Sequence, residues 1–361
     1  MHKDTQKKEK PQSPAEIEAP PESLEKLEDY EQTYPLQLSL FQLLDLKPNE
    51  QSRYSNTIEL YDFMPKYHWG KVKRIGGEFL RVLKREFECR GTKYKIEVAP
   101  AVITDRDGKE RYYYPSKREE LVEDALRRLA TSERGVFLDD RAGATFTLYQ
   151  LQQELKKNRH DYNIRQIKDA LLICNRTNIT VTTADGKAIL SSSMFETLGL
   201  NSREDWKGTG SKTKAFVRFN SLVTESIKKG AFRQLDYEKA MSYSSVIARQ
   251  LHKRMSHHFT QAGFTTRYEI KLSTIIRDFG LAEYARPSLN LSHVLKALNE
   301  MKEKSVLLSY DVQKELDHSN RNKLIDAKFI LTPHPFFSGE ARKINDRQRR
   351  ITRQIPNSEK Q

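Results

Sequence analysis

Residues 163–195, NIRQIKDALLICNRTNITVTTADGKAILSSSMF, contain the change of hydrophobic period on which the expected architecture depends. Asn163 can cap a helix, because its side chain can accept a hydrogen bond from a free backbone N–H of the first turn. The inward face of this helix carries apolar residues at helical spacing, namely Ile164, Ile167 and Leu171. Thr177–Thr183 is β-rich, and a turn at Ala184-Asp185-Gly186 precedes a return strand from Lys187 to Phe195. The segment predicts a helix followed directly by a β-hairpin.

Two more helices are expected before this segment. A short one is marked by Leu148, Leu151 and Leu155. A longer one begins near Arg118, with an apolar face of Leu121, Val122, Ala125, Leu126 and Leu129. Its opposite face carries the charged residues Glu120, Glu123, Arg127 and Arg128. Helix, helix, helix and hairpin is the winged-helix plan, in which the third helix enters the major groove and the wing reaches the backbone or the minor groove.

The same order of elements returns after a polar loop at Asn201–Lys214 and a strand at Ala215–Asn220. Three helices are marked by apolar stripes at Ile247, Leu251, Met255 and Phe259, at Leu272, Ile275, Ile276 and Phe279, and at Leu291, Val294, Leu295, Leu298 and Met301. Ser305–Asp311 and Leu324–Leu331 then flank a polar tip. Two tandem modules of this kind would contact successive major grooves, about 10 base pairs apart.

The remaining segments are expected to be less regular. A strand at Thr57–Asp62 and a hairpin of Lys93–Thr104 and Lys109–Tyr114 suggest a small β-rich region, and the N-terminal arm is rich in proline and charge. The last residues are basic and form either a frayed helix or a loose arm. We therefore predict an α+β protein with a disordered arm (1–33), a peptide ligand (34–47), a β-rich region (48–115), two winged-helix domains (116–220 and 221–338) and a basic tail (339–361).

The charge of the chain favours a polyanionic partner. The formal net charge is +14, and cations that meet phosphates release counterions. A soluble protein that is simply basic is the alternative at this level. Cys89 and Cys174 form no metal-ligand pattern, the N-terminus resembles no signal peptide, and no apolar run is long enough for a membrane span. We expect a cytoplasmic protein with no membrane association.

The pentapeptide Gln37-Leu38-Ser39-Leu40-Phe41 resembles the peptide by which bacterial polymerases and initiators bind the sliding clamp. The Gln37 amide can set the register, while Leu38, Leu40 and Phe41 can fill an apolar pocket. The alternative is an amphipathic turn that packs on its own domain, because Leu43, Leu44 and Leu46 continue the apolar run.

A second resemblance covers roughly residues 118–332. The chain here resembles plasmid replication initiators of the winged-helix, origin-repeat (iteron) binding class. The segments that carry the resemblance are Phe216–Val223, Leu235-Asp236-Tyr237 and the helix Ser244–Met255, which has an Ala-Arg-x-Leu-His-x-Arg pattern at 248–254. The resemblance implies a protein that binds repeats at a plasmid origin, helps to open the origin, and recruits host initiator, helicase and clamp. It also implies a non-enzymatic protein that often forms inactive dimers and binds DNA as a monomer.

Residues that point away from the apolar stripes are the candidate DNA contacts. They are Arg165, Lys168 and Arg176 on the first recognition helix, Asn290, His293, Lys296 and Asn299 on the second, and Lys314, Arg321 and Lys323 at the second wing. Asn can pair with adenine and Arg with guanine, while the wing cations suit phosphates. For each residue the alternative is an ordinary solvated helix face.

An enzymatic function is disfavoured, and no cofactor or metal is expected. His252, His257 and His258 lack a carboxylate at ligand spacing, and no His-x-His pair supports a nicking enzyme. Gly208–Thr213 departs from a P-loop, because Ser211 separates glycine from lysine. The runner-up function is a winged-helix transcriptional repressor, which would favour an inverted repeat and could regulate its own gene.

Overall fold

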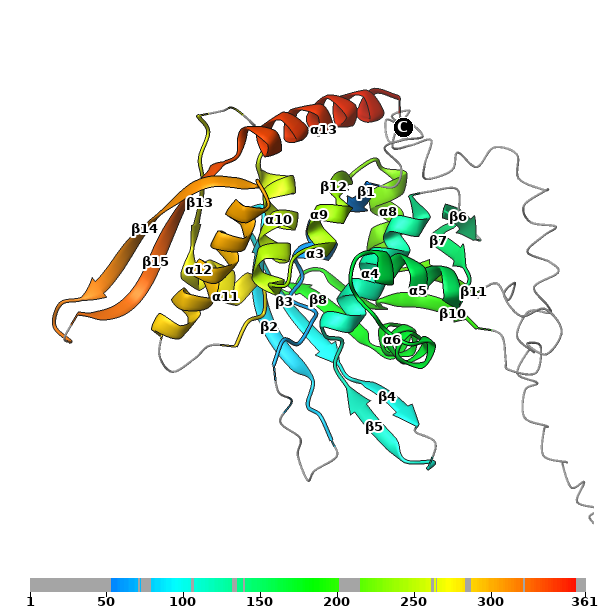
Figure 1. Ribbon diagram of the computed structural model, residues 1–361. Helices are drawn as coiled ribbons and strands as arrows, with labels where there is room; N and C mark the ends of the chain where they lie inside the picture. Colours follow the sequence, from blue (N-terminus) through cyan, green and yellow to red (C-terminus); the bar gives the residue numbers. More distant parts are fainter. Residues whose placement is uncertain are drawn as a thin grey trace, which may run out of the picture. The chain divides into compact units, whose positions relative to one another are not determined.

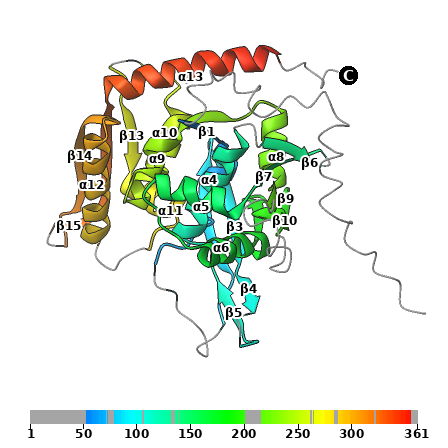
Figure 2. The ribbon, with the colours of Figure 1, turned by 45° about the vertical axis from the view of Figure 1, so that its right-hand side comes forward.

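The computed structural model describes the body of the chain. The described residues are 53–70, 72, 79–104, 107–131, 135–138, 140–200, 215–260, 263, 265–282, 287–320 and 322–354. The expected arm, the Gln37–Phe41 pentapeptide and the Gly208–Thr213 loop lie outside them. All described residues belong to one unit, Leu38–Gln361, of mixed helices and strands (Figures 1 and 2), so the expected α+β class is confirmed.

The first module runs from residue 54 to residue 241. Its helices include α3 (Glu59–Phe63), α4 (Lys117–Ala130), α5 (Leu148–Lys157), α6 (Ile164–Arg176), α8 (Ser221–Lys228) and α9 (Tyr237–Met241). Its strands include β1 (Tyr54–Thr57), β2 (Leu83–Cys89), β3 (Thr92–Ala99), β4 (Ala101–Thr104), β5 (Glu110–Tyr113), β6 (Gly135–Leu138), β7 (Arg141–Phe146), β8 (Asn178–Thr183), β9 (Ile189–Ser193), β10 (Phe195–Gly199), β11 (Ala215–Phe219) and β12 (Arg233–Asp236). They pair as β10-β11-β7-β6, β2-β3-β8-β9, β4-β5 and β1-β12.

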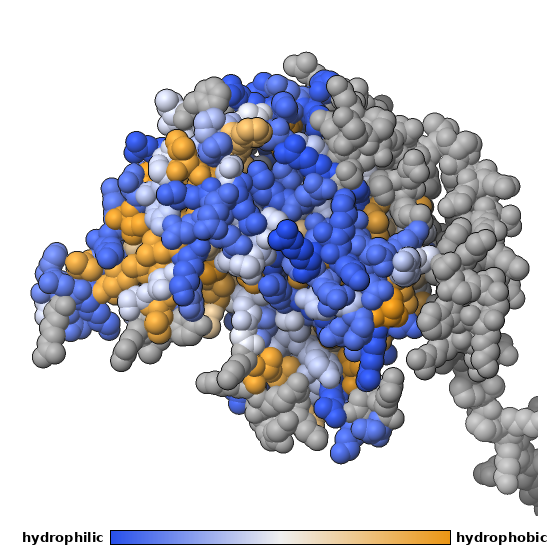
Figure 3. All heavy atoms as spheres, viewed as in Figure 1, coloured by the Kyte–Doolittle hydropathy of each residue, from blue (hydrophilic) through white to orange (hydrophobic). Residues whose placement is uncertain are grey.

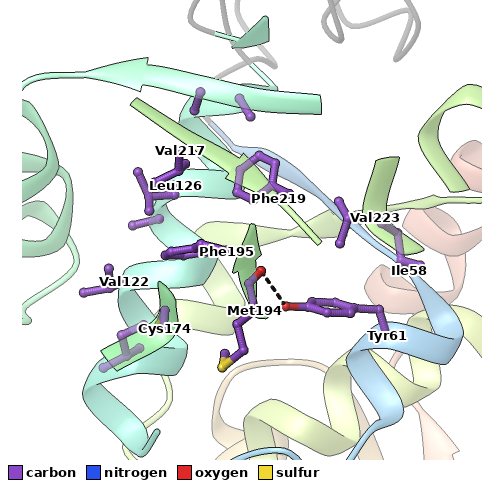
Figure 4. Close-up of a cluster of buried hydrophobic side chains, with 14 of the residues drawn as sticks. Ile58, Tyr61, Val122, Leu126, Cys174, Met194, Phe195, Val217, Phe219 and Val223 are labelled. Atoms are coloured by element: carbon purple, nitrogen blue, oxygen red, sulfur yellow. Dashed lines mark hydrogen bonds between the residues drawn. The ribbon is translucent and has the colours of Figure 1, made fainter. Parts of the chain in front are cut away.

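One hydrophobic core joins these elements. Figure 4 shows Tyr61 of α3 pointing toward Met194, while Val122 and Leu126 of α4 lie on the other side of Phe195 of β10 in the same core. The Tyr61 hydroxyl donates to the Met194 carbonyl oxygen at 3.5 Å. The expectation of a separate β-rich region at 48–115 is therefore corrected. The described part of that region has apolar residues in the shared core, because β3 pairs with β8 along Tyr94–Ala99.

The boundary between the modules also lies later than expected. Helix α8 contributes Val223 and Ile227 to the first core, and α9 contributes Tyr237 and Met241. The second core begins at Tyr243. The predicted boundary at residues 220 and 221 is wrong, because α8, β12 and α9 bury their apolar faces against the first module.

The second module has the order helix, strand, helix, helix, hairpin. Its elements are α10 (Val246–His258), β13 (Tyr268–Lys271), α11 (Leu272–Asp278), α12 (Pro287–Glu303), β14 (Leu307–Asp317) and β15 (Lys323–Pro333). The strands form an antiparallel sheet in the order β13-β15-β14. This is the winged-helix order, with α12 in the position of the recognition helix and β14–β15 as the wing.

The basic C-terminal segment is mostly an ordered helix. α13 (Pro335–Gln354) follows β15 directly and buries Phe337, Ala341 and Ile344. The Asn345 side-chain amide donates to the Thr260 carbonyl oxygen at 2.7 Å. Of the two alternatives for the tail, residues 339–354 take the helical one, because an apolar stripe on that helix finds a surface to cover.

Candidate nucleic-acid interface

The wing and helices α11 and α12 of the second module are held together by specific hydrogen bonds. Asp326 of β15 accepts hydrogen bonds from the backbone N–H of Ser273 at 3.0 Å and from its hydroxyl at 2.7 Å. This carboxylate satisfies a free donor in the first turn of α11 and complements the helix dipole. The Tyr310 hydroxyl of β14 donates to Asn299 of α12 at 2.8 Å. These bonds fix the wing relative to α11 and α12.

Helix α12 presents a polar stripe to solvent along most of its length. His293, Lys296 and Asn299 are exposed, as their sequence spacing predicts. Ser288 and Leu289 in the first turn are exposed too and were not among the candidate contacts. Ser288 precedes Lys296 by two helical turns, so helical spacing could have identified it. The N-terminal residues of a recognition helix are the ones that contact base edges in helix-turn-helix proteins.

Asn290 does not face solvent, and its expected orientation is corrected. Only 4% of its surface is exposed, because it stands one helical turn before the buried Val294. It lines a cavity of about 370 Å³ between α11, α12, β15 and β2, together with Ser273, Arg277 and Ile325. The side chain belongs to the inward face of α12.

The wing carries exposed cations and exposed apolar groups. Lys314 and Lys323 are exposed, and Arg321 lies outside the described residues. Lys314 lies within β14, opposite Ala327, because the strands extend further than the expected Ser305–Asp311 and Leu324–Leu331. Figure 3 shows apolar side chains over this hairpin and α12, where Leu308 and Ile325 are 54% and 57% exposed. The wing therefore combines cations suited to phosphates with apolar surface.

Helix α6 is the predicted recognition helix of the first module. Asn163 accepts from the Gln166 backbone N–H and Gln166 accepts from that of Asn163, each at 2.9 Å, which confirms the predicted cap and completes a capping box. Arg165 and Arg176 are exposed and Lys168 is half-buried. Arg176 also donates to the Val102 carbonyl oxygen of β4 at 2.8 Å. This bond ties the end of α6 to the β4–β5 hairpin.

The β4–β5 hairpin occupies the place beside α6 where a wing was expected from β8–β9. The β8–β9 hairpin forms as predicted, but β3 pairs with the outer edge of β8, so β8 is an inner strand of a four-stranded sheet. In Figures 1 and 2 the β4–β5 hairpin projects from the first module near α6. Lys109 and Arg111 on this hairpin are exposed. They are additional candidate contacts that their position in the sequence did not indicate.

A buried seam of charged and polar residues joins the two modules. Five side chains of α4 and α10 form it: Glu120, Asp124, Arg249, Gln250 and Lys253. Arg249 Nε lies 3.0 Å from Glu120 Oε2, and both side chains are 0% exposed. Gln250 donates to Glu120 at 2.6 Å, and Lys253 Nζ lies 2.7 Å from an Asp124 oxygen. The charged face of α4 is thus buried against α10.

The electrostatic environment favours the ionised forms of Glu120 and Lys253, whereas burial raises the pKa of Asp124. Burial alone would raise the pKa of Glu120, but Arg249 and Lys253 outweigh it and lower that pKa. Burial would lower the pKa of Lys253, but Asp124 and Glu120 raise it. Arg127 of α4 extends the network by donating to Asn56 at 2.8 Å and pairing with Asp62. These buried ion pairs resist separation of the modules, because a buried charge that loses its partner raises the free energy of the protein.

The histidines of α10 are packing residues in this arrangement. His252 lies edge-on between the rings of Tyr243 and Phe337, and burial lowers its pKa to about 4. His257 lies 3.2 Å from the Thr57 hydroxyl, and burial lowers its pKa to about 3. Among the described residues, no group of three or more His, Cys, Asp or Glu side chains is arranged to hold a metal ion.

The Ala-Arg-x-Leu-His-x-Arg pattern at 248–254 has a structural explanation in the same helix. Arg249 belongs to the seam, Leu251 and His252 are buried, and Arg254 pairs with Asp278 at 3.0 Å. The pattern therefore serves the packing of α10 rather than a solvent-facing surface. No helix within the described ranges is both long enough and apolar enough to cross a bilayer.

Comparisons with known proteins give likenesses of fold only. No protein-family model matches the chain, and no curated protein matches it significantly. A crystal structure of domains 2 and 3 of RctB has a TM-score of 0.45 and 12% identity over 80% of this chain and 98% of that one. A crystal structure of the Pi initiator protein in complex with iteron DNA has a TM-score of 0.41 and 13% identity over 60% of this chain and 91% of that one. Likenesses at this level assign no family.

Proposed function

We propose that this protein is a non-enzymatic DNA-binding initiator of plasmid replication that binds repeated sites at an origin. The observation that supports DNA binding best combines two features. The predicted recognition helices α6 and α12 each carry exposed polar residues, and a buried seam joins the modules to which they belong. The seam would hold the helices at a constant separation. One copy could then bind one continuous asymmetric site in two successive major grooves.

The choice of initiator over repressor rests on two features of the sequence. One is the resemblance of residues 118–332 to origin-repeat binders, and the other is the Gln37–Phe41 pentapeptide, which a repressor would not need. We propose that this peptide binds the sliding clamp. Host initiator and replicative helicase are further proposed partners, and the cytoplasm is the proposed location. A repressor that acts as a homodimer remains the second candidate function.

A footprint on the DNA that flanks the gene, measured over a salt series, distinguishes these functions. The initiator should protect several direct repeats spaced by whole helical turns. One protected inverted repeat would instead favour the repressor, because the symmetry of an operator mirrors that of a dimer. Absence of protection at every salt concentration would contradict DNA binding itself.

Clamp binding requires a separate experiment. Replacing Leu40 and Phe41 by Ala should abolish capture of purified clamp, because it removes two apolar side chains worth roughly 1.5–3 kcal/mol each. The footprint should not change. A matched control replaces Leu43 and Leu44 by Ala. Equal clamp capture by the Leu40/Phe41 variant and the wild type would exclude the pentapeptide as the clamp ligand.

A further inference from the structure

Helix α13 has two chemically distinct faces. The inner face buries Phe337, Ala341 and Ile344, whereas Arg342, Lys343, Arg349 and Arg350 are all exposed on the outer face. Of the two acidic residues on this helix, Glu340 pairs inward with Arg53 at 3.4 Å and also lies 3.4 Å from Lys343, and Asp346 lies 3.7 Å from Arg349. Exposed pairs of this kind are weak. The outer face is therefore a net cationic stripe.

The helix is held in place along its length. Phe337 and Ala341 pack in the core of the second module. Further along, Arg347 donates to Gln234 of β12 at 3.1 Å, and Gln348 donates to the Gly230 carbonyl oxygen at 2.5 Å. Contacts at both ends give the stripe a constant geometry. The pair Arg342 and Lys343 lies seven residues, or about 10 Å, from the pair Arg349 and Arg350. This distance is close to the length of three base-pair steps along a DNA strand, about 10 Å.

The stripe does not lie beside α6. In Figures 1 and 2, which differ by a turn about the vertical axis, α13 runs along the top of the described body while α6 and the β4–β5 hairpin lie at the bottom. The candidate contacts for the first site, on α6, the β4–β5 hairpin, α12 and the wing, do not include the cations of α13.

We propose that the outer face of α13 binds the phosphate backbone of a second DNA duplex, independently of its sequence, while α6 and α12 hold the first. Charge complementarity carries the assignment, because a fixed row of Arg and Lys suits phosphates. The proposal rests on the proposed DNA binding. It adds a second site through which one protein molecule bridges two duplexes.

The test uses the full chain and two short duplexes. One duplex of about 20 base pairs carries a single footprinted repeat and is immobilised, and the other is fluorescent, of equal length and unrelated sequence. The short length limits how far the first duplex extends beyond its site. The variant carries Arg342→Gln, Lys343→Gln, Arg349→Gln and Arg350→Gln. A matched control removes four exposed cations from the β2–β3 hairpin by Lys84→Gln, Arg90→Gln, Lys93→Gln and Lys95→Gln.

Wild type and control should capture the second duplex, and the α13 variant should capture at least tenfold less of it. The salt slope for capture should fall by about 3 in the variant. Its footprint on the repeat and its thermal unfolding should match the wild type. Capture that persists in the variant, as expected if two protomers bridge the duplexes, would overturn the proposal. So would failure of the wild type to capture, or equal losses of capture and footprint. Absence of any footprint in the wild type would instead refute the proposed function.

Discussion

Helices α4 and α12 look alike in sequence, since each has an apolar stripe and a polar opposite face. Their polar faces nevertheless differ in burial. The charged face of α4 is buried, with Glu120 and Arg127 at 0% and 2% exposure, whereas Lys296 and Asn299 of α12 are exposed. The difference arises because α10 supplies cations to Glu120 and Asp124, and α3 supplies Asp62 to Arg127. A polar helix face can be buried where each charge finds a partner, and the exposed face is the one available to DNA.

The largest expected effect comes from breaking the seam. Arg249→Met leaves the Glu120 carboxylate buried without its closest cation and should lower the free energy of unfolding by about 3–5 kcal/mol. Urea denaturation measures it. Adding Glu120→Met should restore most of the loss, because two apolar side chains replace the pair. Lys296→Met on α12 is the matched control and should change stability by less than about 0.5 kcal/mol. Equal effects at the two sites would refute the contrast between the helices.

The next largest effect is expected from acidification, which should lower the stability of the fold through the buried histidines of α10. The unfolded chain protonates its histidines below the ordinary pKa of 6.5, whereas folded His252 and His257 stay neutral to about pH 4 and pH 3. Stability is therefore complete above pH 6.5 and is lost as the pH falls. Each histidine should cost about 2 kcal/mol by pH 5. His257→Gln should remove about one proton from the slope between pH 6.5 and 5, and His293→Gln on the exposed face is the control. An unchanged slope in His257→Gln would contradict burial of that side chain.

The exposed face of α12 should affect DNA binding without affecting folding. Replacing Lys296 by Ala should cost about 1–3 kcal/mol of binding to the repeat and relax discrimination at one base position. Asn290→Ala is the informative contrast, because its side chain is buried beside the cavity. It should lower the thermal stability and leave base discrimination intact. Loss of discrimination in Asn290→Ala, measured with single-base variants of the repeat, would place Asn290 in the interface after all.

The smallest expected effect concerns the wing. Replacing Lys314 and Lys323 by Gln should weaken binding to all duplexes to a similar extent and lower the salt slope by about 2. Replacing Lys84 and Lys95 on the β2–β3 hairpin by Gln provides a charge-matched control. A wild-type slope in the wing variant, measured by titration at several salt concentrations, would show that these lysines do not meet phosphates.

The elements of the second module and of α5 and α6 were predictable because their determinants are local. The stripe from Leu291 to Met301 and the cap at Asn163 act within one or two turns, and the expected helices form there. The exposure of Arg165, Lys296 and Asn299 follows from the same spacing. Asn290 was misplaced although spacing alone puts it one turn before Val294, on the buried side.

The sequence by itself determined most of the helices, the β8–β9 and β14–β15 hairpins, the basic charge and the polar stripes, because periodicity, capping and turn chemistry involve residues close along the chain. The strand predicted at Thr57–Asp62 is wrong, because Glu59–Phe63 form helix α3. Only the tertiary structure decided that the charges of α4 are buried, that β8 pairs with β3, and that α13 is anchored with its cations outward. Each of these depends on a partner far away in the sequence. Whether a polar group is buried depends on the free energy of its pairing with that partner, and no local pattern records it.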